Sequence, residues 1–137
     1  GVFHELGHRV DRLSGRMSQR SEFKEALEED FENLVTGYQK LYNCSQKEAY
    51  ADIGNKVRAP EFHSVSDLFG AMSKNQCVGK YYHQNVTYWN KPDRLGKEAF
   101  AHFFEAVCRQ DSKKMDILKE TFPKAYKMFE DMMEELV

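Results

Sequence analysis

Residues 2–14 read VFHELGHRVDRLS, and the pentapeptide HELGH at 4–8 determines how the rest of the chain is interpreted. Apolar residues recur in this stretch at the spacing of an amphipathic helix. Because His4 and His8 are four residues apart, both imidazoles lie on one face of that helix. A single zinc ion can therefore take both as ligands at about 2.0–2.1 Å.

Glu5 and Asp11 add the other groups that an HExxH site uses. Glu5 follows His4 by about 100° around the helix, so its carboxylate lies beside the metal and suits a general base. Asp11 lies on the histidine face, where it can accept the second ring N–H of a ligating histidine. An exposed acid paired with a neighbouring arginine is the alternative for Asp11. A charged surface helix with two histidines is the alternative for the whole motif.

A second cluster of metal-binding residue types lies in residues 97–106, KEAFAHFFEA. Glu98, His102 and Glu105 stack on one face of a predicted helix, whereas Phe and Ala occupy the other face. A catalytic zinc site needs three protein ligands and an open position, so either Glu98 or His102 can complete the histidine pair. Spacing alone does not choose between them. A surface stripe with ordinary i,i+4 pairing is the alternative.

Helical spacing also dominates the rest of the chain. Predicted helices cover residues 21–42, 45–57, 64–73, 94–110, 113–121 and 123–136. Ser21 is expected to cap the first of these, and Ser45 with Glu48 has the spacing of a capping box. Residues 75–91 differ, because aromatic and β-branched residues cluster there without a helical period. That pattern predicts a short hairpin or an irregular loop in a mainly α fold.

Length and charge limit the classes of protein to consider. A chain of 137 residues suffices for one domain, which we expect to span residues 1–137. Lys and Arg total 20 against 22 Asp and Glu, so neither nucleic acid nor a membrane is an expected partner. Cys44, Cys77 and Cys108 lack metal-ligand spacing, which favours reduced thiols of a cytoplasmic protein.

Two segments together resemble a known family. HELGHRVD at 4–11 and EAFAHFF at 98–104 are similar to the two halves of a zincin metallopeptidase site with a glutamate as third ligand, as in the anthrax lethal factor-like peptidases. SDLFGAMS at 66–73, TYWN at 87–90 and LGKEAFAHFFEA at 95–106 also resemble the zincin-like domain of bacteriophage minor head or head-morphogenesis proteins. The resemblance extends from residue 4 to about residue 108.

The resemblance implies a residue-by-residue assignment of the metal site. His4, His8 and Glu98 would bind Zn²⁺, and Glu5 would be the general base. His102 stands where the lethal factor-like pattern has a glutamate. His102 is therefore expected to contact the metal ligands without binding the ion itself, and it stays an alternative third ligand.

The family pattern also includes a tyrosine that stabilises the oxyanion. It stands about seven residues before the ligand glutamate, where this chain has Lys91. Tyr88 is the nearest candidate for this role, with Tyr81, Tyr82 and His83 before it. Packing of these aromatic residues on the core is the alternative.

The resemblance implies a zinc-dependent peptidase of phage or prophage origin. It would cleave a peptide or protein, with other phage head proteins as candidate partners, in the bacterial cytoplasm or the virion. The alternative is a non-catalytic structural or interaction module of a phage head, against which the intact Glu5 argues. Zincins place a β-sheet before the HExxH helix, so we expect a helical C-terminal part of a zincin-like domain from a longer protein. Its first helix would expose an apolar flank and favour self-association.

Overall fold

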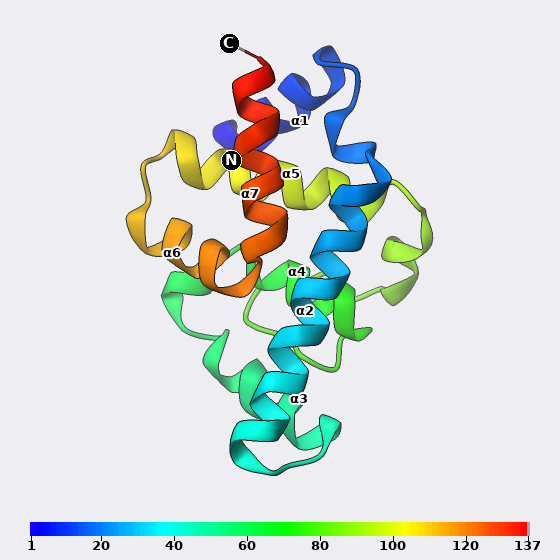
Figure 1. The fold of residues 1–137 in the computed structure, drawn as a ribbon, viewed down its shortest axis with the longest axis vertical. Helices are drawn as coiled ribbons and strands as arrows, with labels where there is room; N and C mark the ends of the chain where they lie inside the picture. Colours follow the sequence, from blue (N-terminus) through cyan, green and yellow to red (C-terminus); the bar gives the residue numbers. More distant parts are fainter. Residues whose placement is uncertain (137) are drawn as a thin grey trace.

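The computed structural model describes residues 1–136, which form seven α-helices and three short 3-10 helices (Figure 1). The α-helices are α1 (Val2–Leu13), α2 (Ser21–Tyr42), α3 (Gln46–Lys56), α4 (Ser66–Ser73), α5 (Arg94–Cys108), α6 (Ser112–Thr121) and α7 (Pro123–Glu135). The 3-10 helices are η1 (Met17–Gln19), η2 (Pro60–Phe62) and η3 (Val86–Asn90). No strand occurs in residues 1–136, so the expectation of a mainly α fold is confirmed. None of these helices combines the length and the apolar character that a bilayer crossing requires.

Local sequence signals explain where some helices begin. The hydroxyl of Ser45 accepts the backbone N–H of Glu48, and the Glu48 carboxylate accepts the N–H of Ser45, each at 3.1 Å. The capping box predicted at the start of α3 is therefore confirmed. Ser21, in contrast, is the first residue of α2, and the cap position falls on Arg20 without a side-chain hydrogen bond. The capping prediction for Ser21 is wrong, because its hydroxyl lies one residue too far into the helix.

The helix α5 is the centre of the molecule. It packs against α1, α2, α4, α6 and α7, and most of its surface is buried. In Figure 1, α2 and α7 run side by side along the long axis, and α5 crosses them. Because α5 is buried nearly all around, each polar side chain on it needs a partner to offset the loss of water.

Phenylalanine side chains fix α5 against α2 and α7. Phe103 meets Phe23 edge to face at a centroid distance of 6.0 Å, and Phe129 at 5.6 Å. Phe100 meets Phe129 at 5.3 Å. All four rings are at most 1% exposed. This arrangement is the one that aromatic quadrupoles favour, and it holds one face of α5 in a fixed position.

The helix α1 approaches α5 closely because Gly7 has no side chain. A Cβ atom at Gly7 would lie 3.1 Å from the Cα of Ala101 and 3.1 Å from the Cβ of Phe104. The opposite side of α1 is apolar and open, with Val2 81% and Leu13 78% exposed. The exposed apolar flank expected from the sequence is thus present, and the short distance between the backbones brings the α1 histidines to α5.

Residues 75–91 are irregular and end in η3, so the hairpin alternative is wrong for this segment. Its backbone bonds to side chains of α4. The hydroxyl of Ser66 donates to the carbonyl of Tyr81 at 2.7 Å, and the carboxylate of Asp67 accepts the N–H of His83 at 2.8 Å. A hairpin would need these backbone groups for its own ladder. The side chains of Ser66 and Asp67 therefore provide the hydrogen-bond partners that a second strand would have provided.

Candidate metal centre

Two antiparallel helices bring five metal-binding side chains together. At one end of the pair His8 of α1 faces Glu98 of α5, and at the other end Gly1 lies beside Glu105. The helix α1 supplies His4 and His8, and α5 supplies Glu98, His102 and Glu105. The stripe on α5 that the sequence indicated therefore faces the two histidines of the HExxH motif.

Both α1 histidines face the carboxylate of Glu98. Nε2 of His4 lies 3.1 Å from Oε2, and Nε2 of His8 lies 3.4 Å from Oε1. The two imidazole rings are 4.7 Å apart and nearly perpendicular. One ligand atom from each residue lies within 4.8 Å of the others, a spacing that one metal ion can bridge. The structure thus brings together the three residues that the zincin resemblance implies as ligands.

Glu98 is ionised although it is only 9% exposed. Burial by itself would raise its pKa, but the hydrogen bond from His4 and the contact with His8 move the pKa well below its ordinary value. The hydroxyl of Tyr88 also donates to Oε1, at 3.2 Å. The carboxylate is therefore in the deprotonated form that binds a metal ion.

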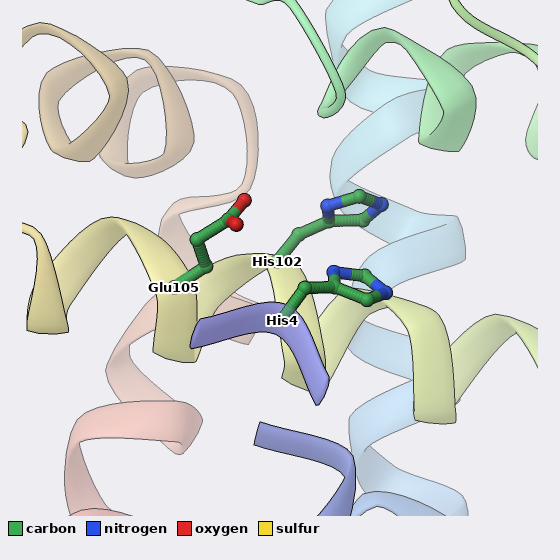
Figure 2. Close-up of side chains that lie close together, drawn as sticks. All are labelled: His4, His102 and Glu105. Atoms are coloured by element: carbon green, nitrogen blue, oxygen red, sulfur yellow. The ribbon is translucent and has the colours of Figure 1, made fainter. Parts of the chain in front are cut away.

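His102 lies beside His4 and has no hydrogen bond. The two ring centroids are 4.6 Å apart, His102 is 6% exposed, and neither of its ring nitrogens has a partner. Burial, together with the neighbouring His4, lowers the pKa of His102 to about 3, so the ring is neutral at pH 7. With His4 and Glu105 it forms a second group whose ligand atoms lie within 4.8 Å of one another (Figure 2).

The sequence left open whether Glu98 or His102 is the third ligand, and the structure keeps both residues available. Each of these residues belongs to a different group of three, and His4 belongs to both groups. Either group could hold a metal ion.

Tyr88 is backed by a histidine and an aspartate. Its ring stacks on the ring of His83 with centroids 3.7 Å apart and planes 6° apart. Nδ1 of His83 lies 2.8 Å from Oδ2 of Asp67. Burial raises the pKa of Asp67, although the bonds to His83 oppose the shift. Sequence reasoning named Tyr88 and His83 but missed Asp67, which stands 16 residues before His83 and is joined to it only by the fold.

A cavity of about 540 Å³ opens beside both groups of ligands. Its lining includes the acids Asp67, Glu98 and Glu105, the histidines His4, His63, His83 and His102, and the tyrosines Tyr81 and Tyr82. Within residues 1–136 the lining holds no lysine or arginine. A concave surface with three carboxylates and no fixed cation attracts positively charged ligands.

Glu5, the expected general base, lies outside this cavity. Its side chain is exposed and borders a separate hollow on α1, together with Val2, Leu6 and Arg9. This position follows from the helix itself, since His4 faces α5 and the next residue lies about 100° further around.

Asp11 is also placed differently from the expectation. It is 1% exposed, and its carboxylate accepts both the N–H of Ser18, at 2.9 Å, and the Ser18 hydroxyl. Within residues 1–136 it makes no hydrogen bond to a histidine ring, and Nδ1 of His8 has no partner. Asp11 therefore fixes the turn from α1 into η1, and neither the histidine contact nor an exposed ion pair forms.

No protein-family model, curated protein or solved structure matches this chain. What the structure establishes is an all-helical domain with buried His and Glu groups able to hold a metal ion.

Proposed function

We propose that this protein is a zinc-dependent peptidase in which His4, His8 and Glu98 hold the metal. The observation that carries the proposal is the convergence of two Nε2 atoms on the two oxygens of one ionised carboxylate. Two histidines and one glutamate are a ligand set of catalytic zinc sites, which keep a further position open for water or substrate. Bound zinc would polarise a peptide carbonyl and lower the pKa of a water molecule.

We propose that Tyr88 stabilises negative charge on the substrate. Its hydroxyl donates to Oε1 of Glu98, the carboxylate that would bind the metal ion. Once Glu98 binds an ion, the hydroxyl can turn to the oxygen of a peptide carbonyl as charge develops there. The stack with His83 and the guanidinium of Arg94, 4.7 Å from the ring centroid, hold the phenol in this position.

Two residues compete for the role of proton acceptor. The HExxH motif assigns the role to Glu5, which is exposed and borders a different hollow. His83 lines the cavity, and its Nδ1 bonds to Asp67. When Nδ1 of His83 donates to Asp67, Nε2 is left as an acceptor, which is the arrangement that a general base needs.

The first test is zinc-dependent hydrolysis of fluorescently labelled casein. We expect activity that chelation abolishes and zinc restores, and loss of activity in Glu98→Gln. The variants Glu5→Gln and His83→Gln identify the base, since removal of a general base costs about 10²-fold or more in rate. Glu120→Gln, which changes an exposed glutamate of α6, is the matched control. Equal rates with and without zinc would exclude a zinc peptidase.

The substrate, the partners and the origin are part of the same proposal and rest on the zincin resemblance alone. We propose that the domain over residues 1–137 belongs to a phage or prophage protein and cleaves a peptide or protein. Other phage head proteins are its candidate partners, in the bacterial cytoplasm or the virion, and α1 is its candidate surface for self-association. The apolar flank of α1 supports that last part, because Val2, Leu6 and Leu13 are exposed.

A second candidate function is a metal-binding structural module without turnover. The position of Glu5 favours it, because the expected base lies outside the cavity. This candidate predicts tight zinc binding that depends on Glu98, together with no hydrolysis by the wild type or any variant. Hydrolysis that is lost in either Glu5→Gln or His83→Gln would exclude it.

A further inference from the structure

His4 lies between two groups of ligands that no single ion can join. The metal-binding side chains of residues 1–136 fall into His4, His8 and Glu98 on one side, and His4, His102 and Glu105 on the other. Among residues 1–136 no larger set of such ligand atoms lies within 4.8 Å of one another. Because the ligand atoms of the two groups do not all lie within 4.8 Å of one another, an ion held by His8 and Glu98 leaves His102 and Glu105 without a bond.

The unbonded imidazole of His102 indicates a ligand at the second group. It is 6% exposed and both ring nitrogens lack a hydrogen-bond partner. Buried polar atoms are normally paired, because an unpaired one costs free energy. Figure 2 shows the ring of His102 lying over the ring of His4, with the carboxylate of Glu105 projecting from the same side of α5. A cation here would bond to a nitrogen that has no other partner.

The charge of Glu105 supports a cation at the same place. Glu105 is 7% exposed, and Nη1 of Arg109 lies 3.8 Å from its carboxylate. That distance is beyond a hydrogen bond, and the Arg109 side chain is 57% exposed. The cavity wall adds the carboxylates of Asp67 and Glu98 and no basic residue. A buried carboxylate without a close partner is costly, and a divalent cation would offset its charge.

We propose that the centre binds two divalent cations, the second held by His4, His102 and Glu105. This inference rests on the proposed zinc site and extends it. Nε2 of His4 faces Glu98, so Nδ1 is the nitrogen left for the second ion. Because a neutral imidazole carries one ring proton, binding through both nitrogens releases that proton to solvent. Two nitrogens and one carboxylate suit zinc, and also cobalt, at the second position.

The test is metal stoichiometry of the chelator-stripped protein, measured by equilibrium dialysis against Zn²⁺ and elemental analysis. We expect two equivalents for the wild type and for the control Glu120→Gln. The variants Glu105→Gln and His102→Asn should each bind one equivalent, as should Glu98→Gln. His4→Ala removes the shared ligand and should weaken both sites. Circular dichroism verifies that each variant is folded.

The outcomes separate this inference from the proposed function. One equivalent in the wild type, kept in Glu105→Gln and lost in Glu98→Gln, would overturn the second cation and leave the zinc peptidase standing. Two equivalents kept in both Glu105→Gln and His102→Asn would also overturn it. No binding, or one equivalent that depends on Glu105 alone, would overturn both proposals. If a variant fails to fold, Co²⁺ titration of the wild type decides, since two ions predict two successive absorption changes and one ion predicts one.

Discussion

His102 shows at the scale of one residue how the metal-free site differs from an ordinary core. In a buried imidazole at least one ring nitrogen normally makes a hydrogen bond. Neither ring nitrogen of His102 makes a hydrogen bond, although the centroid of its ring lies 4.6 Å from that of His4. Burial keeps the ring neutral, so one ring nitrogen has a lone pair that can bind a metal ion. For the same reason the folded protein takes up a proton on this ring only at low pH.

For the metal-free protein we expect the free energy of unfolding to fall as the pH drops below about 6.5. The pKa of His102 is about 3 in the folded state against 6.5 for an ordinary histidine. Between these two pH values His102 is protonated in the unfolded chain but neutral in the folded protein, so acid favours unfolding. Above pH 6.5 the ring is neutral in both states, and His102 causes no loss of stability.

Urea denaturation of chelator-treated protein at about pH 7.5 and about pH 5 measures this loss. The variant His102→Gln lacks the titrating ring and should lose less stability between the two conditions. An equal loss in the variant and the wild type would show that other groups control the acid sensitivity.

The proximity of His4, His8 and Glu98 could be predicted from the sequence, whereas the hydrogen-bond partners of the residues around them could not. His4 and His8 share a helix face through local spacing, and Glu98 is identified by the segment around it. The partner of Asp11 is Ser18, which lies beyond a turn, and the partner of His83 is Asp67 on another helix. Such pairs depend on how the chain reverses direction, which periodicity does not specify.

At the scale of elements, the close contact of α1 with α5 sets the distance between the ligands. Gly7 lies between the two histidines of the motif, and its missing side chain lets the backbones approach. A larger residue there would move the α1 histidines away from Glu98 without removing any ligand. We therefore expect the affinity of the proposed site for a metal ion to depend on Gly7, which carries no metal-binding group.

We expect Gly7→Ala to weaken zinc binding about tenfold, the size of effect seen when residues behind the ligands are altered. The added Cβ would lie 3.1 Å from Ala101 and from Phe104, so α1 must shift by a few tenths of an ångström. Calorimetric titration of the stripped protein measures the change. Gly37→Ala in α2 is the control, since nothing lies within 4 Å of its Cβ position. Equal affinity in both variants would show that the site tolerates movement of α1.

The helices were predictable because each repeats its apolar residues at a regular spacing, whereas residues 75–91 were not. That segment takes its shape from hydrogen bonds to Ser66 and Asp67 on α4. The aromatic and β-branched residues that favoured a hairpin instead form η3 and the stack of His83 on Tyr88. A pattern typical of strands does not produce a sheet when a helix supplies the hydrogen-bond partners.

At the scale of the whole molecule, α1 is attached differently from the other helices. The helices α2, α5 and α7 share a core of phenylalanines, whereas α1 packs against α5 and η1 and exposes much of its apolar side. Elements with few buried apolar contacts open most readily. A metal that bonds α1 to α5 would therefore stabilise a helix that leaves much of its apolar side exposed.

We expect hydrogen exchange of the metal-free protein to be faster in α1 than in α2 and α7, and zinc to slow it chiefly in α1. Mass spectrometry of peptides covering residues 2–13, 21–42 and 123–135 measures the difference. Glu98→Gln should show fast exchange in α1 with and without zinc. Equal slowing over all helices would show that zinc stabilises the molecule globally.

The sequence distance across the site has a consequence for synthesis. His4 and Glu98 are 94 residues apart, so the two histidines leave the ribosome long before the carboxylate they face. Until α5 has emerged, α1 has neither the surface against which it packs nor its third ligand. During the synthesis of the residues between them the nascent chain therefore carries an unpaired apolar helix, and chaperones have time to bind it. If the proposed site holds a metal ion, the ion can be bound by all three residues only after α5 has been made.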